Sequence, residues 1–108
     1  MTTTTISTDH NVATLINVFT VTQTTQQPLV DLLAEATEQV MRHRPGFISA
    51  NIHASLYGTR VVNYAQWRSR EDFLAMLDDP TAREHMSAAE SLATAEPHLY
   101  EVISVQHA

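Results

Sequence analysis

The chain has 108 residues, a formal net charge of −6, only six arginines and lysines together, and no cysteine. This length fits a single domain. The lack of cysteine excludes disulfides, thiolate nucleophiles and thiolate-held zinc or iron–sulfur centres. The scarcity of basic residues argues against binding to nucleic acid or to an anionic membrane surface.

The first twelve residues are polar and rich in threonine. They lack the charged start and apolar core of a signal peptide, and no apolar run in the chain is long enough to span a bilayer. We therefore expect residues 1–12 to be a mobile tail, residues 13–108 to form one domain, and the protein to be cytoplasmic.

A strand and a helix are predicted after the tail. Residues 13–21 are rich in β-branched side chains, which is typical of a strand. Residues 27–43 repeat apolar side chains at helical spacing, with Pro28 suited to the first turn. The pair Pro45-Gly46 ends this predicted helix.

The next stretch predicts a hairpin, with strands at residues 47–55 and 59–67. A two-residue turn at Tyr57-Gly58 joins them and sets their register. One face, expected to lie under the helices, holds Ile48, Ala50, Ile52, Val61, Asn63, Ala65 and Trp67. The opposite face holds Phe47, Ser49, Asn51, His53, Val62, Tyr64 and Gln66.

The last elements complete a β-α-β-β-α-β order. Ser69 followed by Asp72 predicts a helix start, Asp79-Pro80 predicts another, and residues 97–105 predict the last strand. This order is typical of a ferredoxin-like α+β fold. The helices cover one side of such a sheet, and a second copy of the chain is the simplest cover for the other. We therefore expect a homodimer.

Asn63 and Trp67 are unusual on an otherwise apolar strand face. Asn63 is either a structural amide or a hydrogen-bond donor to a substrate oxyanion. Trp67 is either a core residue with a locally bonded indole N–H or a pocket wall that stacks on an aromatic ligand. Asn17 resembles Asn63 and shares its strand face with Phe19. An apolar pocket with a few polar groups is typical of a ligand site.

The remaining motifs predict no metal site and no cofactor. His53 is interpreted as a partly exposed or interface residue, and His85 as a surface histidine, an acid/base or an axial haem ligand. The other histidines, His10, His43, His98 and His107, show no pairing. With only two glycines and no Gly-x-Gly, a glycine loop for flavin or nicotinamide is not expected.

The strings PGFISA and VVNYAQW, with the helix start Ser-Arg-Glu-Asp-Phe, resemble the antibiotic biosynthesis monooxygenase superfamily. Within it, the likeness is to the cofactor-independent, quinone-forming monooxygenases of aromatic polyketide pathways. It is detailed over residues 45–73 and looser over 13–106. It implies a dimeric α+β barrel with one pocket per subunit, between sheet and helices. It also implies that Asn63 and Trp67 are catalytic, and that a small phenolic substrate reduces O2 without metal or flavin.

The chain departs from those relatives at two positions. They carry Tyr where Phe73 stands, and a basic residue where Met86 stands, with Arg83 and His85 close by. The residues expected to bind substrate are Asn17, Phe19, Ile52, Phe73, Met76, Arg83, His85 and Met86.

Two alternative functions remain open at the level of sequence. The superfamily includes haem-degrading enzymes, and Asn17 and His85 resemble their amide and axial histidine. The second-helix Trp of those enzymes is replaced by about Met76. The other alternative is a dimeric small-molecule binding module without catalysis.

Overall fold

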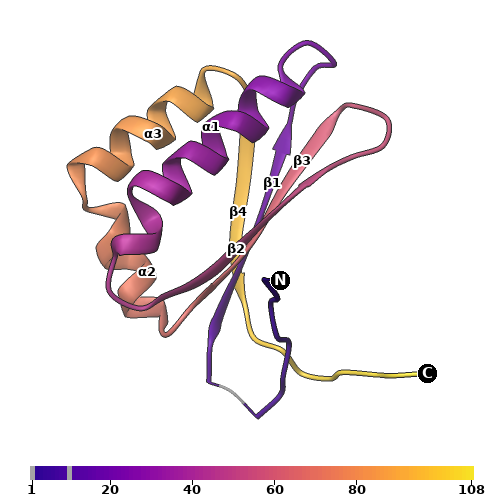
Figure 1. Cartoon of the computed structure of the whole chain (residues 1–108), viewed down its shortest axis with the longest axis vertical. Helices are drawn as coiled ribbons and strands as arrows, with labels where there is room; N and C mark the ends of the chain where they lie inside the picture. Colours follow the sequence, from indigo (N-terminus) through magenta and orange to yellow (C-terminus); the bar gives the residue numbers. More distant parts are fainter. Residues whose placement is uncertain (1, 10) are drawn as a thin grey trace.

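A four-stranded antiparallel sheet and three α-helices form the fold in the computed structural model, which describes residues 2–9 and 11–108 (Figure 1). The elements are β1 (Ala13–Thr20), α1 (Gln26–Gln39), the 3-10 turn η1 (Met41–His43), β2 (Phe47–Ala54), β3 (Arg60–Trp67), α2 (Arg70–Leu77), α3 (Pro80–Glu90) and β4 (Thr94–Tyr100). The strand order is β2-β3-β1-β4, and all three helices lie on one side of the sheet. The predicted ferredoxin-like α+β fold is confirmed.

The helices α2 and α3 begin where the sequence predicts. The hydroxyl of Ser69 accepts a hydrogen bond from the N–H of Asp72 at 3.1 Å. The carboxylate of Asp79 accepts from the N–H groups of Thr81 and Ala82, at 2.8 and 3.0 Å. These side chains satisfy backbone donors that the first helical turn leaves free.

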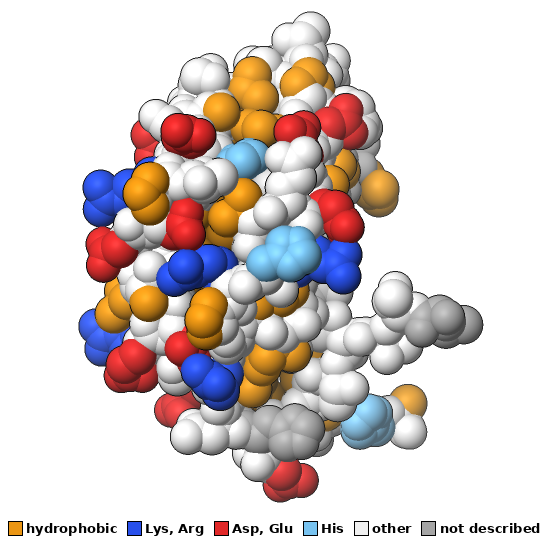
Figure 2. Space-filling view, turned by 60° about the vertical axis from the view of Figure 1, so that its left-hand side comes forward, with side chains coloured by type: hydrophobic (Ala, Val, Ile, Leu, Met, Phe, Trp, Pro, Cys, Tyr) orange, Lys and Arg blue, Asp and Glu red, His pale blue; other side chains and the backbone are white. Residues whose placement is uncertain are grey.

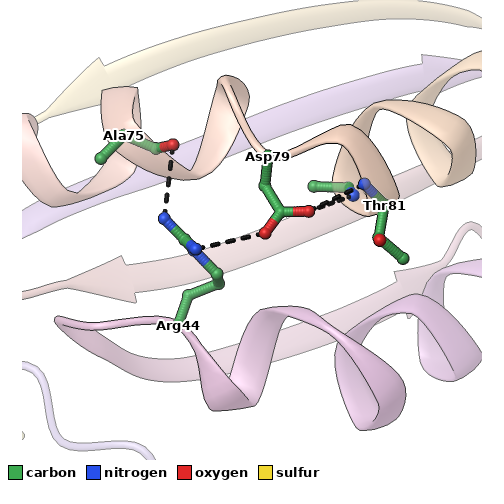
Figure 3. Close-up of polar contacts among 5 residues, drawn as sticks. Arg44, Ala75, Asp79 and Thr81 are labelled. Atoms are coloured by element: carbon green, nitrogen blue, oxygen red, sulfur yellow. Dashed lines mark hydrogen bonds and ion pairs between the residues drawn. The ribbon is translucent and has the colours of Figure 1, made fainter.

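Arg44 joins the end of η1 to the junction between α2 and α3 (Figure 3). Its Nη1 lies 3.2 Å from Asp79 Oδ2, and its Nη2 donates to the carbonyl of Ala75 at 3.5 Å. The hydrogen bond from Ala82 N–H is the largest cause that lowers the pKa of the Asp79 carboxyl. The N–H of Thr81 and the charge of Arg44 lower this pKa further. Asp79 therefore both caps α3 and ties it to the rest of the fold.

The helix α1 ends four residues earlier than predicted. Val40, at φ −125° and ψ −63°, interrupts it, and the 3-10 turn η1 takes the place of the last helical turn. Gly46 then adopts φ +83°, and a Cβ at this position would overlap the side chain of Asp72. Glycine is therefore required here for both its backbone angle and its size.

The hairpin keeps the predicted register, although its turn is longer. Ala54 pairs with Val61 and Ala50 with Ala65, as a Leu56–Thr59 pairing requires. The connection, however, covers residues 55–59. Its β-turn runs from Ser55 to Gly58, whose N–H donates to the carbonyl of Ser55 at 3.2 Å while Gly58 takes φ +81°.

A β-bulge in β2 makes the predicted sides of Phe47 and Ile48 wrong. The register shifts between Phe47 and Ser49, so the alternation of side chains is displaced at this end of the strand. Phe47 packs edge-on against Trp67 with ring centroids 5.4 Å apart, whereas Ile48 is 48% exposed.

The last strand lies earlier in the chain than predicted. β4 covers Thr94–Tyr100 rather than residues 97–105, and it pairs with β1 from Thr20↔Thr94 to Thr14↔Tyr100. Since β1 starts at Ala13, residues beyond Tyr100 have no neighbouring strand to extend the ladder. They run away from the body of the domain (Figure 1).

The helix-free side of the sheet carries part of the N-terminal segment. Thr4 Oγ1 donates to Asn51 Oδ1 at 2.6 Å, and Gln66 Nε2 donates to the carbonyl of Thr5 at 2.7 Å. The segment has no strand or helix in its described part, and its mobility stays a prediction. His10, predicted to have no partner, lies outside the described residues. None of the helices described is long and apolar enough to cross a bilayer.

Candidate active site

A cavity of about 280 Å³ lies between the helix-facing side of the sheet and the three helices. Its walls are mainly apolar. The lining residues that have polar side-chain atoms are Asn17, Thr37, Asn63, Trp67, His85, Glu90 and His98. Figure 2, in which the helix-covered side of the molecule is turned forward, shows hydrophobic side chains between charged ones. An apolar cavity with few polar groups is the usual make-up of a small-molecule site.

Two clusters of buried side chains place the amides at the middle of this cavity. One cluster contains Leu15 and Ala65, and the other contains Phe19 and Val61. Asn17 lies between Leu15 and Phe19 on β1, and Asn63 lies between Val61 and Ala65 on β3. Asn17 and Asn63 are direct cross-strand partners, so the two amides form the middle of the sheet wall.

The helix α3 spans the same two clusters from the other side. Ala82 belongs to the first cluster and is fully buried, while Ala89 belongs to the second. His85 and Met86 lie between these alanines and line the cavity. Residues three and four positions apart share a helix face. His85 and Met86 therefore face the sheet wall at the level of the two amides.

The amide oxygens of Asn17 and Asn63 differ in their hydrogen bonds. Asn17 Oδ1 accepts a hydrogen bond from the backbone N–H of Glu96 on β4 at 3.2 Å, which fixes the orientation of this amide. Asn63 Oδ1 is fully buried with no donor among the described residues. The amide nitrogens of both residues bind no protein acceptor within the described chain. Asn17 and Asn63 can therefore each offer an N–H group to a ligand.

Trp67 is both a core residue and a cavity wall. Only 2% of its surface is exposed, and it contacts Phe47 and Phe73 edge-on, with centroids 5.4 and 6.1 Å away. Its ring also lines the cavity. In the described structure the indole N–H has no acceptor, so the local bond considered as one of two alternatives is not formed.

His85 is half-buried, and its hydrogen bond decides its tautomer. Its Nδ1 lies 2.9 Å from the carbonyl oxygen of Thr81, one turn earlier in α3. A carbonyl can only accept, so Nδ1 carries the proton in the neutral ring and Nε2 keeps its lone pair.

The structure brings together eight of the ten predicted site residues. The cavity is lined by Asn17, Phe19, Asn63, Trp67, Phe73, Met76, His85 and Met86. The other two, Ile52 and Arg83, do not line the cavity. Ile52 packs on the second core cluster. Arg83 is turned outward, with Nε donating to the carbonyl of Leu77 at 2.9 Å and its side chain 65% exposed.

Sequence reasoning missed part of the lining. Lining residues that were not predicted as site residues include members of α1, η1, β2, α2, the end of α3 and β4: Leu32, Leu33, Ala36, Thr37, Met41, Phe47, Leu77, Glu90, Ala95, Pro97, His98 and Leu99. The alternation of Ala95, Pro97 and Leu99 was available as a strand signal, but the predicted strand began at residue 97. Phe47 was hidden by the bulge.

No group of three or more His, Cys, Asp or Glu side chains in the described ranges could hold a metal ion. The polar groups of the sheet wall are instead neutral amides and an indole. Such groups stabilise an anion by hydrogen bonding rather than by charge.

Comparison with known proteins identifies the family. The pattern of the family described as Antibiotic biosynthesis monooxygenase matches residues 13–88 of this chain. The chain belongs to this family. Tetracenomycin-F1 monooxygenase from Streptomyces glaucescens is 46% identical over 98 residues, which are 91% of this chain and 88% of that protein. The chain is therefore an enzyme of the monooxygenase class, and the resemblance seen at residues 45–73 is confirmed.

Solved structures of this family share the fold. A variant of SnoaB, a cofactor-independent oxygenase from Streptomyces nogalater, superposes with a TM-score of 0.80 at 22% identity, covering 88% of this chain and 96% of that chain. A monooxygenase from the gene ActVA-Orf6 of Streptomyces coelicolor, in complex with nanaomycin D, gives a TM-score of 0.76 at 29% identity. That match covers 90% of this chain and 91% of the other.

Proposed function

We propose that this monooxygenase acts without a cofactor and converts a phenolic or anthrone-type aromatic polyketide intermediate to a quinone with O2. The observation that carries the proposal is the sheet wall, where Asn17, Asn63 and Trp67, whose side chains carry neutral N–H groups, line a mainly apolar cavity. The name of the 46% identical relative supports a polyketide substrate. A cavity of about 280 Å³ is at the small end of ligand sites and suits one compact, planar molecule.

The reaction balances without an external electron donor. A substrate anion transfers an electron to O2, the two radicals combine at the ring carbon, and water is lost. One oxygen atom becomes the new carbonyl, and the other leaves as water with two hydrogens from the substrate. The protein's task is to stabilise the anion. An anthrone that loses a proton from its ring carbon gives the same anion as its phenol tautomer, and a free phenol ionises only near a pKa of about 10.

The two amides stabilise this anion. The two residues lie side by side at the middle of the sheet wall, so their N–H groups can donate to one substrate oxygen. The backbone N–H of Glu96 holds Asn17 in place before substrate binds. Donors fixed in advance in a dry site stabilise developing charge more than water does. Trp67 provides a flat apolar wall that orients the ring.

Phe73 stands where the family resemblance implies a tyrosine. Its ring lines the cavity and packs against Trp67, with no hydroxyl to reach the substrate. The polar contacts of the substrate therefore depend on the sheet wall and on α3.

The proposed active protein is a homodimer. The helix-free side of the sheet carries half-buried apolar side chains, among them Ile16, Val18, Val62 and Tyr64, which a second copy could cover. Light scattering after size exclusion tests this proposal. A mass near twice 12.1 kDa is expected, and a mass of one chain at micromolar concentration would contradict it.

The enzymatic proposal is tested by aerobic turnover of anthrone with protein treated with a metal chelator. We expect oxygen uptake matched to quinone formation, and lower rates for Asn63→Ala and Trp67→Phe. Wild-type rates in both variants would remove the residue assignment. No oxygen uptake above the uncatalysed rate, for anthrone and for a hydroxylated anthrone, would remove the function.

A further inference from the structure

We propose that His85 Nε2 is the group that accepts the proton from the substrate. It takes this proton from the ring carbon that lies opposite the substrate oxygen bound by the amides. This inference rests on the proposed function and names the base that its first step requires. Three observations support it: the position of His85, its tautomer and the lack of another suitable group at the cavity.

The position follows from the way α3 crosses the sheet. Ala82 and Ala89 pack on the two core clusters that flank Asn17 and Asn63, so the segment between them forms the wall opposite the amides. A planar substrate that points its oxygen at the sheet wall points its opposite edge at α3. His85 is the residue of this segment that both lines the cavity and can exchange a proton.

The hydrogen bond to Thr81 prepares the ring as a base. Nδ1 is occupied as a donor to a backbone carbonyl, 2.9 Å away, and the lone pair is left on Nε2. After Nε2 takes a proton, the positive ring keeps the Nδ1–H bond to that carbonyl. The carbonyl belongs to the same helix, so this support moves with His85 and survives side-chain substitutions at position 81.

The other titratable groups at the cavity are less well placed than His85 to accept the substrate proton. Glu90 lies at the end of α3 and is exposed. His98 on β4 is mainly exposed, and its Nε2 lies 3.8 Å from the Glu96 carboxylate at the surface. The lining side chains from α1 and α2 carry no charge. Arg83, next to His85 on α3, bonds to Leu77 and faces away.

The proposed step is a proton transfer without redox change. The C–H bond of the ring carbon breaks, an N–H bond forms at Nε2, and the electron pair moves through the ring to the oxygen held by the two amides. The imidazolium of His85 then returns its proton to the oxygen that leaves as water. A positioned general base contributes about 10²–10⁴-fold to such a step.

Hydrogen exchange without oxygen isolates this step from the oxidation. Anthrone is incubated with the protein in D2O under anaerobic conditions, and deuterium uptake at the ring carbon is followed by mass spectrometry against the uncatalysed rate. We expect the wild-type protein to accelerate exchange and His85→Gln to lose at least 100-fold of that acceleration. His43→Gln, which changes an exposed histidine that does not line the cavity, should keep it. Added imidazole is expected to restore exchange to His85→Ala.

The outcomes separate this inference from the proposed function. Because the chain has one tryptophan, quenching of Trp67 fluorescence by anthraquinone reports whether each variant still folds and binds. Intact binding and exchange within threefold of wild type in His85→Gln would overturn the role of His85 while leaving the oxygenase function standing. No exchange and no oxygen uptake in wild type would instead overturn the function. A haem Soret shift that His85→Gln abolishes would also overturn the role of His85 as a base, because its lone pair would then serve a metal.

Discussion

The unpaired amide of Asn63 predicts that an apolar substitution makes the protein more stable. Asn63 Oδ1 is buried without a donor from the part of the chain that the structure describes, and such a group costs about 1–3 kcal/mol of folding free energy. Replacing Asn63 with Leu, which has a similar shape, removes this cost beside a cavity that has room for the side chain. We expect Asn63→Leu to unfold at a higher urea concentration than wild type.

Asn17→Leu is the matched control, because Asn17 is the direct cross-strand partner of Asn63 and lines the same cavity. Its amide oxygen is satisfied by Glu96 N–H, so the substitution breaks a hydrogen bond worth about 0.5–1.5 kcal/mol. The apolar gain is shared by both variants and cancels in the comparison. Asn63→Leu should therefore exceed Asn17→Leu by about 2 kcal/mol or more in unfolding free energy.

Urea denaturation measures this difference. With an m value of about 1–3 kcal/mol/M, the midpoints of the two variants should differ by about 1 M at equal m. We expect both variants to lose activity, since each loses an N–H donor at the sheet wall. Equal midpoints, or a less stable Asn63→Leu, would contradict this prediction and would show that the Asn63 oxygen already has a partner in the folded protein.

Three further predictions concern the frame of the site. Trp67→Ala should cost about 3–5 kcal/mol, since the ring is 2% exposed, and calorimetry showing a loss below about 1 kcal/mol would contradict its core role. Gly46→Ala should cost at least about 1–2 kcal/mol from its positive φ, with further loss from overlap with Asp72. An unchanged urea midpoint would show that neither the backbone angle nor the overlap destabilises the variant. The pKa of the Asp79 carboxyl is lowered in the folded state, so its stabilising effect is complete above the unfolded pKa of about 3.9 and is lost as pH falls through the lower folded value. Unfolding free energy measured from pH 5 to pH 2 should therefore fall less steeply in Asp79→Asn, which keeps the cap but loses the charge; parallel curves would contradict this.

The helix starts and the hairpin register could be predicted because they depend on residues close together in the sequence. The helix starts at Ser69 and Asp79 depend on side chains that bond the next turn, and the structure has both. The pairing register of the hairpin follows from a short connection and from the alternation of apolar side chains. Asn63 and Trp67 could be singled out because polar and bulky residues stand out on an apolar strand face.

The remaining features depend on contacts that local sequence does not encode. The bulge in β2 exchanges the sides of the sheet on which Phe47 and Ile48 lie. This exchange goes with the packing of Phe47 on Trp67, a contact between residues far apart in the sequence. The end of β4 is fixed by where its partner β1 begins. Arg83 lies close in sequence to Met86 but turns outward to the carbonyl of Leu77, which a helical pattern alone does not show.

The most direct test of the account is isotopic labelling of the product. Protein freed of metal and flavin is mixed with anthrone under ¹⁸O2, and the quinone and water are analysed by mass spectrometry. We predict one ¹⁸O atom in each quinone and one in water, at a rate that drops in Asn63→Ala. Quinone formed without ¹⁸O, or a reaction that starts only when metal or flavin is added, would contradict it.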